Sequence, residues 1–171
     1  GAGLRVTAAV DLYMQEESEK LLLAKTHYLE GLVPPKKSAE PLQSAAVLID
    51  VETGNVRAIY GGDTQISTDW NRATQSRRQG GSAFKPLVYA TAFEAGVATP
   101  GTLLEDAPLT VEAGGQLWTP SNDDDQFRGW VTARAALELS LNVPTAQLAM
   151  QTGLPKVVAM ARACGIQSRL K

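Results

Sequence analysis

A serine and a lysine three positions apart, Ser82 and Lys85, are the residues of this sequence best suited to nucleophilic chemistry. They follow the pair Gly80-Gly81, and Pro86 comes directly after the lysine. Proline is tolerated in the first turn of a helix because the N–H groups there have no intrahelical partner. The pattern therefore predicts a helix that begins at or just before Ser82 and places the serine hydroxyl and the lysine amine on one face.

A lysine can act as the base for a serine nucleophile only when its amine is neutral. Free lysine has a pKa near 10.4, so a neutral amine at pH 7 needs a decrease of about 3 units. Burial against the apolar helix and the positive end of that helix both act in this direction. The arginines at 72, 77 and 78 either add to the effect or belong to a solvated loop. A helix-capping serine beside a surface lysine fits the local sequence equally well, and a second Ser-x-x-Lys occurs at 168–171.

Ser140 and Asn142, in the tripeptide SLN, form a second candidate pair. Helical patterns precede and follow the tripeptide, and Pro144 suits the first turn of the second helix. The sequence thus predicts a corner between two helices, from which side chains can project into a cleft. Taken alone, the pair is better explained as a turn, with Asn142 capping the helix that starts at Pro144.

The surrounding patterns indicate a protein of mixed helices and strands. A helical pattern begins at Asp11, with Gly31 as its expected end, and a proline- and lysine-rich loop follows at 33–41. Two apolar runs, 44–50 and 55–60, predict a hairpin that turns at Gly54. A last helix is expected between Pro155 and Gly165, with Cys164 in the core.

The composition of the sequence argues against several classes of function and of site. The 171 residues carry a net charge of -2, which does not suggest a nucleic-acid surface, and one cysteine excludes an internal disulfide. No run of about 20 apolar residues is present, so no membrane span is expected. The lone His27 argues against a histidine triad, and the acidic run 123–125 lacks the spacing of a calcium loop. The glycine pairs match no phosphate-binding loop, so neither a metal nor a cofactor is expected.

Four longer segments resemble, in the same order, the transpeptidase domain of class A penicillin-binding proteins. They are AAVLIDVETGNVRAIYGG at 45–62, NRATQSRRQGGSAFKPLVYATAFEAG at 71–96, WTPSN at 118–122 and GWVTARAALELSLNVPTAQLA at 129–149. The segment 6–22 is similar to the connector that precedes this domain. The resemblance implies a connector at 1–40 and the amino-terminal portion of a serine transpeptidase domain at 41–171. It implies the α/β fold of penicillin-binding proteins and β-lactamases, an antiparallel sheet flanked by helices, incomplete in this chain.

The resemblance also implies a role for each candidate residue. Ser82 would be the acylated nucleophile, which attacks the carbonyl between two D-alanines of a peptidoglycan stem peptide, and its N–H would form half of the oxyanion hole. Lys85 would be the base. Ser140 would relay protons to the leaving amine, and Asn142 would bind the substrate amide and hold Lys85. β-Lactam antibiotics would bind as the same kind of acyl donor.

One family motif, Lys-Thr/Ser-Gly, is not found in the sequence after Ser82. The resemblance therefore implies that the remainder of the transpeptidase domain supplies it, with a glycosyltransferase domain and a membrane anchor upstream. The expected location is the outer face of the cytoplasmic membrane, in the cell envelope. Two alternatives remain: a β-lactamase with a rapidly hydrolysed acyl-enzyme, and a non-catalytic binding module with the same fold. The four retained polar residues argue against the module.

Overall fold

The protein is represented by a computed structural model that describes residues 3–32, 41–63, 70–113 and 115–170. The chain forms two compact units, Gly1–Arg78 and Gln79–Lys171. None of the helices in the described residues combines the length and the apolar character needed to cross a bilayer. The predicted loop at 33–41 lies outside the described residues, except for Pro41.

In the first unit, helix α1 (Leu12–Leu32) begins where the sequence predicts, directly after Asp11. The Asp11 carboxylate accepts a hydrogen bond from the Met14 N–H at 3.0 Å. This bond gives a partner to one of the N–H groups that the first turn leaves unpaired. The helix runs one residue past Gly31, its predicted end.

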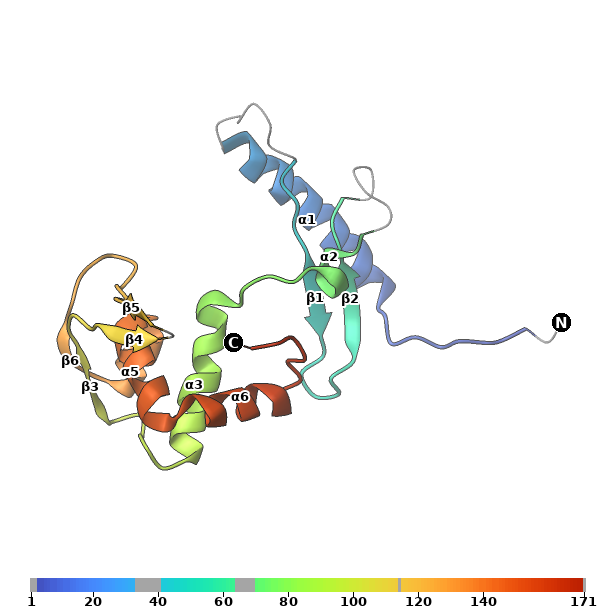
Figure 1. The fold of residues 1–171 in the computed structure, drawn as a ribbon. Helices are drawn as coiled ribbons and strands as arrows, with labels where there is room; N and C mark the ends of the chain where they lie inside the picture. Colours follow the sequence, from blue (N-terminus) through green and yellow to red (C-terminus); the bar gives the residue numbers. More distant parts are fainter. Residues whose placement is uncertain (1–2, 33–40, 64–69, 114, 171) are drawn as a thin grey trace. The chain divides into compact units, whose positions relative to one another are not determined.

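The predicted hairpin is present as strands β1 (Ala46–Ile49) and β2 (Val56–Tyr60), which pair antiparallel. Gly54 lies in the turn with φ at +71°, a conformation that glycine adopts without steric cost. Helix α1 packs along β2 (Figure 1). The Gln15 side chain of α1 both donates to and accepts from the backbone of Ile59, at 2.9 Å each, and so fixes the helix to the strand. The short helix α2 (Arg72–Gln75) ends this unit.

In the second unit, the predicted serine–lysine helix consists of two parts. A 3-10 turn, η1, covers Gly81–Phe84, and helix α3 continues as Lys85–Glu94. Ser82 therefore lies in the tight turn, and Lys85 is the first α-helical residue. Pro86 occupies the first turn of α3, as predicted, where its missing N–H removes no hydrogen bond.

Four short strands and three helices complete the second unit. They are β3 (Leu103–Asp106), β4 (Val111–Ala113), β5 (Gln116–Trp118), β6 (Gly129–Thr132), α4 (Ala133–Glu138), α5 (Asn142–Thr152) and α6 (Leu154–Ala163). Strand β3 pairs antiparallel with β6, and β4 with β5. The predicted corner between two helices is confirmed, although α5 begins two residues before Pro144. The second helix start predicted from a proline is confirmed too, because Pro155 lies in the first turn of α6.

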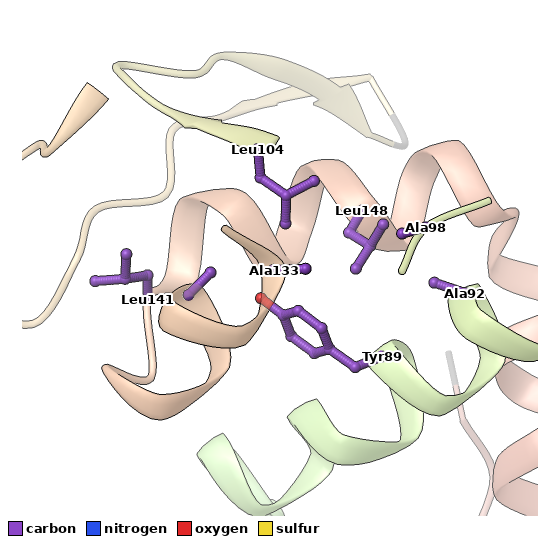
Figure 2. Packing of buried hydrophobic residues seen from close by; sticks show 8 residues of the cluster. Tyr89, Ala92, Ala98, Leu104, Ala133, Leu141 and Leu148 are labelled. Atoms are coloured by element: carbon purple, nitrogen blue, oxygen red, sulfur yellow. The ribbon is translucent and has the colours of Figure 1, made fainter. Parts of the chain in front are cut away.

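The hydrophobic core of the second unit lies where α3, α4, α5 and β3 meet (Figure 2). It contains Tyr89, Ala92, Ala98, Leu104, Ala133, Ala136, Leu141 and Leu148. Leu141, the middle residue of the SLN tripeptide, is only 2% exposed. Its burial anchors the corner and leaves its polar neighbours, Ser140 and Asn142, on the outside of the core.

Candidate active site

Lys85 is a buried lysine, with only 8% of its surface exposed. Its Nζ donates three hydrogen bonds, to Ser140 O at 2.5 Å, Ser140 Oγ at 2.9 Å and Asn142 Oδ1 at 2.7 Å. An ammonium group has three donors and no acceptor, so these bonds satisfy it fully. The start of α3 and the corner before α5 are thereby joined through one side chain.

Ser140 adopts an unusual backbone conformation, with φ at +54°. The left-handed region is unfavourable for a residue with a Cβ atom and costs of order 1 kcal/mol. In this conformation both the carbonyl oxygen and the hydroxyl of Ser140 reach the amine of Lys85. The strained backbone of Ser140 therefore allows two hydrogen bonds to the buried amine of Lys85. Backbone strain of this kind is common at functional sites.

The amide of Asn142 is held from both ends. Its Oδ1 accepts from Lys85, and its Nδ2 donates to the backbone carbonyl of Ser121 at 2.8 Å. Since the carbonyl of Ser121 can only accept and the amine of Lys85 donates, the two contacts fix which end of the amide faces the lysine. Asn142 is the first residue of α5, so its side-chain position depends on how that helix begins.

Burial lowers the pKa of Lys85 from its ordinary value of 10.5, and the negative charge of Asp123 acts in the opposite direction. The direction agrees with the requirement for a neutral amine, because desolvation penalises the charged form. Burial is therefore the cause of the decrease.

Ser82 lies one turn before Lys85, with its side chain exposed. The Lys85 backbone N–H donates to the Ser82 carbonyl, which closes the 3-10 turn. Within the described residues, no hydrogen bond joins the Ser82 hydroxyl to Lys85 Nζ, whose bonds go to the corner before α5. The structure therefore brings Lys85, Ser140 and Asn142 together, and Ser82, three residues before the lysine, is exposed.

Two residues behind the cluster, Asp106 and Asn122, were not identified as site residues from the sequence. Asn122 Oδ1 accepts from the backbone N–H groups of Asn142 and Val143, at 2.8 and 3.3 Å. Its Nδ2 donates to both carboxylate oxygens of Asp106, at 2.8 and 3.0 Å. The sequence LLED of β3 does not alternate, so its inward positions, Leu104 and Asp106, are evident only from the structure. A carboxylate at an inward strand position requires a buried polar partner.

Comparisons with known proteins show which family this chain resembles. Residues 44–171 match the family model "Penicillin binding protein transpeptidase domain". The chain is 43% identical to Penicillin-binding protein 1A of Neisseria lactamica, over 67% of this chain and 15% of that protein. It is 37% identical to Penicillin-binding protein 1B of Vibrio cholerae, over 96% of this chain and 21% of that protein. The chain thus spans about a fifth or less of the length of these curated relatives.

Solved structures show the same fold. The PonA1 protein from Mycobacterium tuberculosis, solved in complex with penicillin V, superposes with a TM-score of 0.75 and 31% identity, over 99% of this chain and 41% of that one. Penicillin-Binding Protein 1A from Haemophilus influenzae gives 0.69 and 30%, over 75% of this chain and 20% of that one. The predicted α/β fold is therefore confirmed. The family model, the relatives and the superposed structures together place this chain in the transpeptidase-domain family of class A penicillin-binding proteins.

Proposed function

We propose that this chain forms part of a serine D,D-transpeptidase that cross-links peptidoglycan stem peptides, with Ser82 as the acylated nucleophile. The observation that carries the proposal is the buried amine of Lys85, bonded to both polar residues of the SLN corner one turn after an exposed serine. Such a cluster has no use in packing alone, since a buried amine costs free energy that an apolar side chain would not. A hydroxyl beside a desolvated amine is the usual arrangement of an activated nucleophile.

The hydrogen bonds around Lys85 suggest how the amine works as a base. Ser140 O and Asn142 Oδ1 can only accept, so a neutral amine would direct its two N–H groups to them. Its lone pair would then face a hydroxyl, and the Ser140 hydroxyl at 2.9 Å can either donate or accept. Ser140 can thus carry a proton to or from Lys85 by turning its hydroxyl, while the other two bonds keep the amine in place.

Acylation would follow from this arrangement. Ser82 Oγ attacks the carbonyl carbon of the terminal D-Ala-D-Ala amide and gives its proton to Lys85. The C–N bond then breaks, and the proton passes through Ser140 to the leaving amine of D-alanine. The Ser82 backbone N–H would stabilise the oxyanion, and Asn142 would also hold the substrate amide. An acceptor amine from a second stem peptide attacks the ester in turn, loses a proton and restores the Ser82 hydroxyl. A β-lactam would acylate Ser82 in the same way, with its ring amide as the bond that breaks.

The wider setting of the proposal follows from the relatives. Residues 1–40 would connect to an upstream glycosyltransferase domain with a membrane anchor, and the rest of the transpeptidase domain would supply the Lys-Thr/Ser-Gly motif. The enzyme would then act in the cell envelope, outside the cytoplasmic membrane, and need no cofactor. This domain arrangement and location are inferred from the similarity of the chain to proteins named Penicillin-binding protein 1A and 1B.

A labelling experiment with a fluorescent penicillin tests the proposal on the full-length protein that contains this sequence. We expect a long-lived covalent label that Ser82→Ala abolishes. Ser168→Ala is the matched control, because it removes the exposed serine of the second Ser-x-x-Lys spacing, and it should label normally. Label that disappears within seconds would indicate a β-lactamase, and a protein that never labels would indicate a binding module; either result contradicts the transpeptidase.

A further inference from the structure

Helix α5 begins without a capping side chain of its own. Its N-cap position is Leu141, an apolar residue whose side chain makes no capping hydrogen bond. The first N–H groups of a helix need acceptors, and a buried N–H without one costs about 1–3 kcal/mol. Here the acceptor comes from a different segment. Asn122 Oδ1 accepts hydrogen bonds from the backbone N–H groups of Asn142 and Val143, the first two residues of the helix.

The orientation of the Asn122 amide is fixed on its other side by Asp106. Asn122 Nδ2 donates to both oxygens of this carboxylate and to the backbone carbonyl of Gln126 at 2.8 Å. All three atoms are acceptors, so the amide nitrogen must face them and the amide oxygen must face α5. Asp106 is fully buried and Asn122 is 3% exposed, which shields these bonds from competing water.

The carboxylate of Asp106 is itself held in place. Its Oδ2 accepts from the backbone N–H of Arg128 at 3.1 Å, and Arg128 Nη1 lies 3.9 Å from the same oxygen. The guanidinium charge offsets the cost of burying a carboxylate. Strands β3 and β6 pair so that Asp106 lies opposite Gly129, which brings the carboxylate and the Arg128 backbone together.

We propose that Asn122, oriented by Asp106, is a positioning residue for acyl transfer, which sets the start of α5 so that Ser140 and Asn142 face Lys85. The neighbouring Ser121 supports this role, because its carbonyl accepts from the Asn142 side chain. One short loop therefore holds both the backbone and the side chain of Asn142. The inference rests on the proposed function, since it assigns a task within the same site.

Asn122 and Asp106 affect the rate of acyl transfer indirectly, because they set the position of Ser140 and Asn142 relative to Lys85. With the Asn122 amide removed, two N–H groups at the start of α5 lose their acceptor, and the corner can shift away from Lys85. A displacement of about 1 Å in a reacting group costs up to roughly 100-fold in rate. A loosened corner also admits water to Lys85, which moves the pKa of the lysine back toward its ordinary value. Asp123, the charged neighbour of Lys85, stays in each variant.

The test measures the rate of penicillin acylation against pH in the full-length protein, together with the melting temperature. Asn122→Ala should acylate at least about 10-fold more slowly, with its pH profile displaced toward higher pH. Asn122→Asp places a second carboxylate against the buried Asp106 and loses the donor to it, so it should acylate at least as slowly as Asn122→Ala. Thr152→Val is the control: it removes a buried hydroxyl that bonds to Leu148 O at 2.7 Å, at the far end of the same helix.

Thr152→Val should lower the melting temperature and leave both the acylation rate and its pH profile unchanged. The proposal is overturned if Asn122→Ala acylates within about twofold of the rate of the unmodified protein and has the same pH profile. It is also overturned if Thr152→Val lowers the melting temperature as much as Asn122→Ala does and slows acylation by the same factor. Failure of the proposed function gives a different result, because the unmodified protein would then carry no label on Ser82.

Discussion

Lys85 Nζ lies 2.7 Å from Asn142 Oδ1, although the two residues are 57 positions apart in the sequence. The contact joins the first residue of α3 to the first residue of α5. Both helices contribute to one hydrophobic core, through Tyr89 and Leu148, so the pair is positioned by packed elements rather than by free loops. The amine and the amide can therefore keep one geometry without substrate, which is what electrostatic preorganisation requires.

Asn142→Asp should replace the amide oxygen beside Lys85 with a negative charge. An opposite charge at this distance favours the ammonium form, so the pKa of Lys85 should rise and penicillin acylation at neutral pH should fall by about 10-fold or more. The melting temperature should change little, because the new ion pair with Lys85 offsets the loss of the hydrogen bond from Asn142 Nδ2 to the Ser121 carbonyl. Asn55→Asp, at an exposed position in the hairpin turn, should acylate normally. Full acylation at neutral pH by Asn142→Asp would contradict this role.

Ser140→Gly and Ser140→Ala should separate the backbone of this residue from its hydroxyl. Both variants remove Oγ, so both should slow acylation to a similar extent. Glycine adopts the observed φ of +54° without strain, whereas alanine does not, so the glycine variant should be more stable by about 1 kcal/mol. Urea denaturation of the two variants measures the difference. Equal stability would show that Ser140 leaves the left-handed region when its hydroxyl is absent.

Leu148→Ala should weaken the core that carries the site. Leu148 is fully buried, and truncation of such a residue costs about 2–5 kcal/mol through lost burial and the cavity that remains. Leu154→Ala is the matched control, since Leu154 is 57% exposed, and its cost should stay below about 0.5 kcal/mol. Thermal unfolding compares the two. Similar losses for both variants would contradict the assignment of Leu148 to the core.

The unfolding free energy should depend on pH through Lys85. Because burial lowers its pKa below 10.5, the unfolded state binds more protons than the folded state between the lowered pKa and 10.5. The contribution of this residue to stability should therefore rise with pH across that window. Lys85→Met, which cannot be protonated, should remove this part of the slope in denaturant titrations at several pH values. If Lys85→Met leaves the pH dependence of the unfolding free energy unchanged, that dependence arises from other groups.

Local patterns were sufficient to predict the elements that carry the site. Pro86 and Pro155 marked the starts of α3 and α6, and Gly54 marked the hairpin turn. These features depend only on neighbouring residues, so a single sequence reveals them. Cys164 was predicted to lie in the core and is exposed instead. It follows the last residue of α6, where the helix has ended and no longer directs the side chain inward.

The support behind the site could not be predicted in the same way. The contact of Asn122 with the start of α5 spans 20 positions, and its contact with Asp106 spans 16. Such pairings depend on how β3, β6 and the loop between them fold, which no local period encodes. From the sequence, Asn122 was included only as part of the WTPSN segment, and Asp106 was not singled out.

The pH dependence of penicillin acylation on Ser82 tests most directly whether Lys85 is the base. In the full-length protein we expect the second-order rate to rise with pH and to level off with an apparent pKa below 10.5, the ordinary value of lysine. Lys85→Ala should abolish the rise together with nearly all of the rate. A rate that does not change with pH, or a Lys85→Ala variant that acylates as fast as the unmodified protein, would contradict the role of Lys85.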